Sequence, residues 1–418
     1  MVYKKYFLFS IGIFSLLLGL FFQENSSGGA EYDHNYLLPI IKAFGVDLKQ
    51  GFKSFLLDAG AAVHSPIFYI IIGKLLHFTD NLNYLKIFYI FLSSLLPLTF
   101  YQILKQYKNI TNIYVFMFSL ILFISPYFRS SSIWLLGDNL SLIFLSLSIL
   151  FYNKHEKKNN IIYCYYCLFF LSLCCYIRYY YFPFYIFYML VFLKKYNLQN
   201  IIKLLFFSFL IALPALIYFY YIIKYFSFYN YINLNSGHSL QNYSTNFLVV
   251  LSISLFYLLP FIPSFFKDLK IYLFKEKKRI FLIFSFFSIF YFLDIFIYQK
   301  LIFFGGSNYG GGIFKKIFEI LNLNVEFLLT LIGFLSFVIL DFIFKNDRKY
   351  NFILFSCLVL SLPFVYLFQK YLDPLFLLIL FGLVKSEYVK NILENLKKYI
   401  FLYYAYFLLF LTSTFIIY

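Results

Sequence analysis

Residues 6–22 have the sequence YFLFSIGIFSLLLGLFF, and the polar stretch QENSSGGA follows at residues 23–30. The first stretch carries no charge and approaches the ~20 apolar residues that an α-helix needs to cross a bilayer. Lys4 and Lys5 stand directly before it, which favours a cytoplasmic N-terminus. Because many similar stretches follow, residues 6–22 are predicted to be an uncleaved signal anchor rather than a removable signal.

The composition extends this interpretation to the whole chain. The 418 residues are 62% hydrophobic and 26% aromatic, and only 13% are charged, about half the charged share of a typical soluble domain. A soluble enzyme, a disordered protein and a disulfide scaffold are excluded. The net charge of +17 falls in short clusters between apolar stretches, which is the pattern that sets membrane topology. We therefore expect no nucleic-acid partner.

The predicted fold class is an all-α polytopic membrane protein with about 13 transmembrane helices. We expect one membrane-embedded domain over residues 1–418, with no separate soluble domain. The candidate spans are 6–22, 84–104, 112–128, 138–152, 161–176, 179–193, 201–223, 247–263, 280–299, 327–344, 350–367, 373–384 and 399–417.

The apolar stretch 66–78 decides which side of the membrane each later loop occupies. It is short and contains Lys74. If it does not cross, most of the 35 Lys and Arg residues fall in compact clusters on the cytoplasmic side, as the positive-inside rule requires. Residues 31–78 are then extracytoplasmic, and we expect them to hold two amphipathic helices on the membrane surface. The C-terminus is expected outside.

With this topology, isolated charges collect on the extracytoplasmic face. Charges at the edges of spans are costly and mark candidate functional sites. Transfer of a sugar from a lipid-linked phosphate needs a base for the acceptor proton and cations for the departing phosphate. The candidates are Glu31, Asp33 and Asp138 as catalytic acids or bases, and His34, His64, Arg129, Arg178, Lys370 and Tyr371 as substrate-binding residues. The glycine-rich stretch 305–312 could form a mobile lid.

The order of these motifs resembles the GT-C superfamily of membrane glycosyltransferases, closest to protein O-mannosyltransferases and lipid A aminoarabinose transferases. An acidic motif, Glu31-Tyr32-Asp33, follows the first span, and about thirty residues later His64-Ser65-Pro66 precedes an apolar helix. The resemblance covers residues 1–195 well and residues 196–418 only loosely. Family members often carry Asp-Glu and His-Pro-Pro where this chain has Glu31-x-Asp33 and His64-Ser65-Pro66.

The resemblance implies that Asp33 is the catalytic base or positions the acceptor, that Asp138 is a second acid, and that Arg178 and Lys370 lie near the lipid phosphate. Whether Glu31 or Asp33 acts as the base stays open. A divalent cation held by these acids also stays open as a cofactor. Ordinary roles compete with these: Asp138 would make a good helix N-cap, and arginines at span ends often extend to lipid headgroups.

The resemblance also implies the partners: a polyprenyl-phosphate sugar donor, a lipid, glycan or protein acceptor, and membrane lipids. The active site would face the periplasm from a bacterial inner membrane, or the lumen of the endoplasmic reticulum. Two alternatives remain: an O-antigen polymerase or ligase, and a multi-span transporter or flippase. Asp341 and Asp294 lie within spans and are predicted to be structural residues of the bundle.

Overall fold

The computed structural model describes residues 2–58, 65–107, 112–226, 243–298, 310–362 and 367–417. Over these residues the chain is helical and forms no strand. It divides into two compact units, Met1–Ser236 with Tyr404–Tyr418 (unit 1) and Gly237–Tyr403 (unit 2). Each unit is described below by itself.

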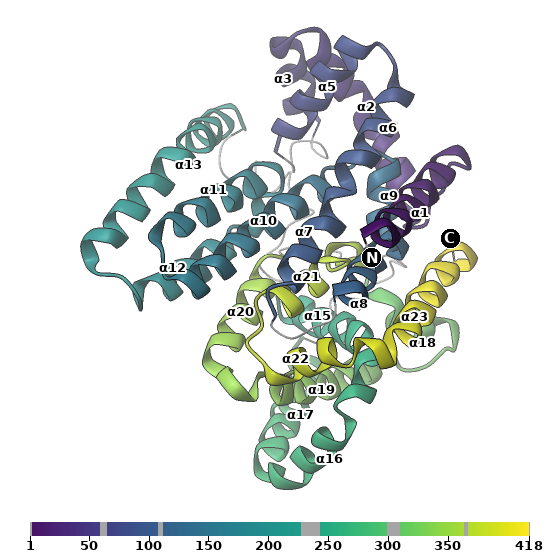
Figure 1. Ribbon diagram of the computed structural model, residues 1–418, viewed down its shortest axis with the longest axis vertical. Coiled ribbons are helices and arrows are strands. Elements are labelled where there is room, and N and C mark those ends of the chain that lie inside the picture. Colours follow the sequence, from purple (N-terminus) through teal and green to yellow (C-terminus); the bar gives the residue numbers. More distant parts are fainter. Residues whose placement is uncertain are drawn as a thin grey trace. The chain divides into compact units, whose positions relative to one another are not determined.

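Unit 1 contains the helices of the N-terminal half (Figure 1). They are α1 (Val2–Phe21), α2 (Ala30–Val46), α3 (Leu48–Leu57), α5 (Ile67–Thr79), α6 (Leu82–Ser93), α7 (Leu95–Leu104), α8 (Asn112–Ser119), η1 (Leu120–Ile124), α9 (Pro126–Ile133), α10 (Gly137–Lys158), α11 (Ile161–Ile177), η2 (Tyr179–Tyr181), α12 (Pro183–Leu193) and α13 (Leu198–Phe226).

Unit 2 contains most of the later helices. They are α15 (Tyr243–Leu258), η4 (Leu259–Ser264), α16 (Phe266–Lys275), α17 (Lys277–Tyr298), α18 (Gly312–Ile320), α19 (Val325–Phe344), η6 (Lys345–Asp347), α20 (Arg348–Leu360), η7 (Gln369–Tyr371), α21 (Leu375–Gly382) and α22 (Glu387–Glu394). The last helix, α23 (Leu396–Ile417), begins in unit 2 and ends in unit 1.

Several described helices have the length and apolarity of membrane spans, which fits a helical multi-pass membrane protein. Five helical segments meet both conditions, and six do if the bent pair Ile113–Ile124 and Pro126–Ile133 counts as one span. The thirteen spans expected from the sequence are therefore not confirmed. The five segments are Tyr3–Phe21, Leu82–Leu104, Leu198–Tyr218, Asn246–Ser264 and Val325–Leu360.

Within residues 31–78, the part that the structure describes forms three helices, α2, α3 and α5, where the sequence suggested two. Asp47 separates α2 from α3, because its extended backbone ends one helix and its side chain accepts the N–H of Gln50 at the start of the next. Helix α5 has 13 residues and is about 20 Å long, which is too short to cross a ~30 Å hydrocarbon core.

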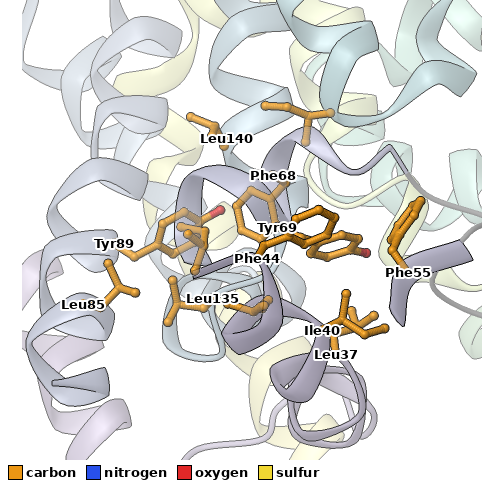
Figure 2. Close-up of a cluster of buried hydrophobic side chains, with 13 residues drawn as sticks. Leu37, Ile40, Phe44, Phe55, Phe68, Tyr69, Leu85, Tyr89, Leu135 and Leu140 are labelled. Atoms are coloured by element: carbon orange, nitrogen blue, oxygen red, sulfur yellow. The ribbon is translucent and has the colours of Figure 1, made fainter. Parts of the chain in front are cut away.

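Helices α2 and α5 pack with their backbones in close contact. A Cβ atom added at Gly73 would lie 2.3 Å from the Ile41 carbonyl oxygen, and one at Gly45 would lie 2.7 Å from the Gly73 carbonyl oxygen. Only glycine permits this approach. A buried apolar cluster including Phe44, Phe68 and Tyr69 surrounds the contact and includes side chains from α6 and α10 (Figure 2).

Helices α10 and α11 form an antiparallel pair along most of their lengths. The turn between them is short: Asn159 adopts a left-handed conformation, and the Asn160 side chain accepts the N–H of Ile162 to begin α11. Because the two helices run in opposite directions, the start of α10 and the end of α11 lie at the same end of the pair.

Candidate functional site

Asp138 and Arg178 form an ion pair at this end of the α10–α11 pair. The Nε and Nη2 groups of Arg178 donate to the two carboxylate oxygens of Asp138, each at 2.9 Å. The Asp138 side chain is 32% exposed and that of Arg178 is 12% exposed. Asp138 is not the helix N-cap, a position that Leu136 occupies without a side-chain bond. The carboxylate therefore fixes the guanidinium at this end of the helix pair in a bidentate geometry.

Tyr69 of α5 lies near both this ion pair and Asp33 of α2. Burial raises the pKa of Tyr69; the charge of Arg178 and its hydrogen bond to the hydroxyl lower it, whereas the charges of Asp138 and Asp33 raise it. All three ionic side chains thus act on one buried hydroxyl group. The structure brings three of the predicted site residues, from α2, α10 and the end of α11, around a single tyrosine in unit 1.

Glu31 and Asp33 interact with different neighbours. They lie two residues apart in the first turn of α2, a spacing that turns side chains to nearly opposite sides of a helix. The charge of Glu31 acts on Lys86 of α6, whereas that of Asp33 acts on Tyr69 of α5. The two acids therefore belong to two separate polar groups.

His34 is buried against Trp134, next to Lys86. The imidazole and indole ring centroids are 5.8 Å apart, and the Lys86 ammonium lies 4.2 Å from the Trp134 ring centroid. Burial, with a contribution from the charge of Lys86, lowers the pKa of His34 to about 4, and the backbone of Trp134 offsets this in part. His34 is therefore neutral at physiological pH.

Arg129 of α9 uses all of its donors inside unit 1. A guanidinium group has five N–H donors. Two go to the carboxylate of Glu24 and two to the hydroxyl and carbonyl oxygens of Ser15, and the fifth goes to the carbonyl oxygen of Phe123. Both partners of the Arg129–Glu24 ion pair are buried. In this arrangement no N–H group of Arg129 is left to hold a substrate phosphate.

Lys370 and Tyr371 lie in unit 2, in η7. The Lys370 ammonium lies 5.5 Å and 5.6 Å from the ring centroids of Phe368 and Tyr371. The neighbouring Gln369 accepts the N–H of Ile313 at 3.0 Å, and so joins η7 to the first turn of α18. The end of the predicted glycine-rich lid, residues 310–312, is therefore tied to this segment. Its earlier part, residues 305–309, lies outside the described residues.

Two other expectations concern His64 and a cation. His64 lies outside the described residues. Among the residues that the structure describes, no group of three or more His, Cys, Asp or Glu side chains is arranged to hold a metal ion.

Sequence reasoning missed the aromatic and ionic partners of the site. Tyr69, Trp134, Lys86 and Glu24 each contact or act on a predicted site residue, and of these only Glu24 stands in a polar stretch of the sequence. Trp134 is the only tryptophan of the chain. Its position between Arg129 and Asp138 could have indicated that it belongs to the site. Lys86, a charge at the third residue of the predicted span 84–104, was a second signal.

The chain matches no known protein family, no curated protein and no solved structure. The chemistry must be inferred from the site itself. A carboxylate such as Asp33 can accept a proton. The arginine of the neighbouring arginine–carboxylate pair can stabilise an anion.

Proposed function

We propose that this chain is a GT-C-like glycosyltransferase of about 13 spans that moves a sugar, with inversion, from a polyprenyl-phosphate donor to a hydroxyl acceptor on the extracytoplasmic side of a membrane. The grouping of Asp33, Tyr69 and the Asp138–Arg178 pair in unit 1 carries the proposal. The apolar helices of the chain and the order of its motifs support it further.

In this scheme Asp33 takes the proton of the acceptor hydroxyl as its oxygen forms a bond to the anomeric carbon of the donor. The bond from that carbon to the phosphate oxygen breaks, and the electron pair leaves with the polyprenyl phosphate. Arg178 stabilises the charge that develops on this phosphate. Asp138 holds the guanidinium in place through both of its oxygens, so it is a positioning residue.

The proposed site uses residues of unit 1 alone. Asp33, rather than Glu31, is the proposed base, because the charge of Glu31 acts on Lys86. Arg129 is assigned to holding α9 against α1 and the segment that follows it, through Ser15 and Glu24. His34 supports the start of α2 through its contact with Trp134.

The test replaces Asp33 with Asn in cells whose own copy of the gene is deleted. Loss of a general base lowers rates by about 10²–10⁴-fold. We therefore expect Asp33→Asn to accumulate the lipid-linked sugar and to lose the matching sugar from envelope glycans, both measured by mass spectrometry. Asp80→Asn is the matched control, since Asp80 is exposed and ends α5 in a left-handed conformation that Asn adopts readily.

Both variants must reach the membrane in amounts equal to the wild-type protein. Unchanged envelope sugar in cells that carry Asp33→Asn contradicts the proposed base. A change in lipid-linked sugars on one side of the membrane only, with no glycan lost, indicates a flippase instead.

A further inference from the structure

A second ionic group lies in unit 2 and has no part in the proposed reaction. Asp341 of α19 is fully buried. Arg279, at the start of α17, donates from Nη2 and Nε to its two carboxylate oxygens at 2.7 Å and 2.6 Å. The Tyr272 hydroxyl of α16 donates to the same carboxylate, and Arg348, at the start of α20, lies 3.4 Å from it. The sequence predicted Asp341 to be structural. In the structure its carboxylate interacts with side chains of three other helices, α16, α17 and α20.

The charges of this group do not balance. One carboxylate faces two guanidinium groups, whose side chains are 38% and 32% exposed. Asp341 can therefore neutralise only one of the two guanidinium charges, although the charge of Glu276 also acts on Arg279. Since a guanidinium has five donors and Arg279 uses two of them on Asp341, N–H groups remain that can bind an anion such as a phosphate.

Further basic residues lie on both sides of the two arginines. Lys277 and Lys278 precede Arg279 in the first turn of α17, and Lys345 and Lys349 flank Arg348. The Lys345 ammonium lies 4.7 Å from the Tyr388 ring centroid. Two acids stand nearby in the sequence, Glu276 and Asp347, and the side chain of Asp347 already caps α20. The surface around Asp341 is therefore strongly basic.

Helix α16 adds an apolar surface beside these charges. Leu269 and Tyr272 are buried against the unit, whereas Phe266, Ile271 and Phe274 are each more than half exposed. The Lys277 ammonium lies 5.8 Å from the Phe274 ring centroid. Exposed large apolar residues next to lysines are typical of a helix that lies in a membrane interface. Figure 1 shows α16 beside α17 and α19.

We propose that Arg279 and Arg348 bind the phosphate group of an anionic phospholipid, while the exposed face of α16 lies among the acyl chains of the same leaflet. A lipid fits better than free phosphate, because only a lipid places apolar chains next to Phe266, Ile271 and Phe274. The basic loops around 275–279 and 345–349 are those that the positive-inside rule assigns to the cytoplasm, where anionic headgroups attract such clusters. This site is independent of the proposed glycosyl transfer.

The test measures thermal unfolding of the purified full chain in a neutral detergent, titrated with short-chain phosphatidylglycerol. Phosphatidylcholine of the same chain length and inorganic phosphate are titrated in parallel. We expect phosphatidylglycerol alone to raise the unfolding temperature in a saturable way. Arg348→Gln is expected to weaken the apparent affinity of the protein for phosphatidylglycerol about fivefold. This is the effect of removing one basic charge near an anionic lipid surface. Lys49→Gln, at an exposed position in unit 1, is the matched control and should bind like wild type.

Arg348→Gln could also disturb folding, since Arg348 faces the buried Asp341. Lys278→Gln combined with Lys345→Gln removes two charges and leaves the ion pairs of Asp341 intact, and it too is expected to weaken the affinity. Equal shifts with both lipids overturn the proposal, as does an equal shift with inorganic phosphate. Wild-type affinity in the double-lysine variant also overturns it, whether or not Arg348→Gln folds.

Discussion

Two acidic residues that look equivalent in the sequence have different surroundings. Glu31 and Asp33 lie in one motif, but the α-helical turn directs them to different neighbours, Lys86 and Tyr69. The charge of Glu31 acts on Lys86 of α6. Asp33 is left as the acid that shares Tyr69 with the Asp138–Arg178 pair, which is the reason for assigning it the role of base.

The buried His34 makes stability depend on pH. Its pKa falls from 6.5 in the unfolded chain to about 4 in the folded protein, so the unfolded state binds more protons between these values. The contribution of His34 to the free energy of unfolding is therefore complete above pH 6.5. It declines as the pH falls towards 4, by about 3 kcal/mol in total. His34→Phe keeps an aromatic ring against Trp134 and removes the titration.

The measurement is the thermal unfolding temperature of both proteins in detergent between pH 4 and pH 7. The wild-type protein is expected to lose more stability on acidification than His34→Phe does. Parallel curves for the two proteins would show that groups other than His34 dominate the acid response.

At the level of helices, the contact of α2 with α5 positions the site. Asp33 is on one of these helices and Tyr69 on the other, so their separation depends on how closely the backbones approach at Gly45 and Gly73. The sequence showed a glycine in each apolar helix but not that the two would meet. Many glycines of a membrane protein face lipid or lie in turns, and only packing distinguishes them.

We expect Gly73→Ala to separate the two helices. The added methyl group would lie 2.3 Å from the Ile41 carbonyl oxygen, and overpacking of this kind costs about 1–3 kcal/mol. The unfolding temperature in detergent should fall, and the envelope sugar measured in the Asp33 experiment should fall with it. Gly29→Ala is the control, since a Cβ atom there meets nothing within 4 Å. Equal unfolding temperatures for the two variants would mean that α2 and α5 move apart without loss of stability.

The boundaries of apolar segments were predicted best where the segment has no sharp bend. The expected span 84–104 corresponds to the apolar segment Leu82–Leu104, and 201–223 begins within three residues of α13. The stretch 112–128 was predicted as one span, but a bend of 64° after Ile124 divides it, with Ser125 extended and Pro126 beginning α9. Hydropathy records the apolar stretch and not the bend, which Pro126 imposes on the backbone.

For the whole molecule, the orientation in the membrane is the property that the proposals need most. The charge distribution predicts residues 31–78 outside and the loop around 154–158 inside. We therefore expect Lys49→Cys to react with a membrane-impermeant maleimide in intact cells, and Lys158→Cys to react only after permeabilisation. Both positions are exposed.

The wild-type protein is the control for this labelling, because four of its five cysteines are buried and the fifth is partly buried. The reverse pattern would place Asp33 on the cytoplasmic side and remove the proposed extracytoplasmic transfer. Labelling of both variants in intact cells would instead mean that residues 31–78 and the 154–158 loop face the same side.

The amino-acid sequence was sufficient for the membrane class, the helical content and the location of isolated charges, because hydropathy and charge are properties of short segments. It also predicted Asp138 and Arg178 on the same face of the membrane, because the clusters of basic residues set the expected topology. The sequence could not show which charges are neutralised by partners. Arg129 and Arg178 look alike as lone cations, but Arg129 has its donors used by Glu24, Ser15 and Phe123. Such pairings join residues up to 114 positions apart, and only the packing of the folded chain brings them together.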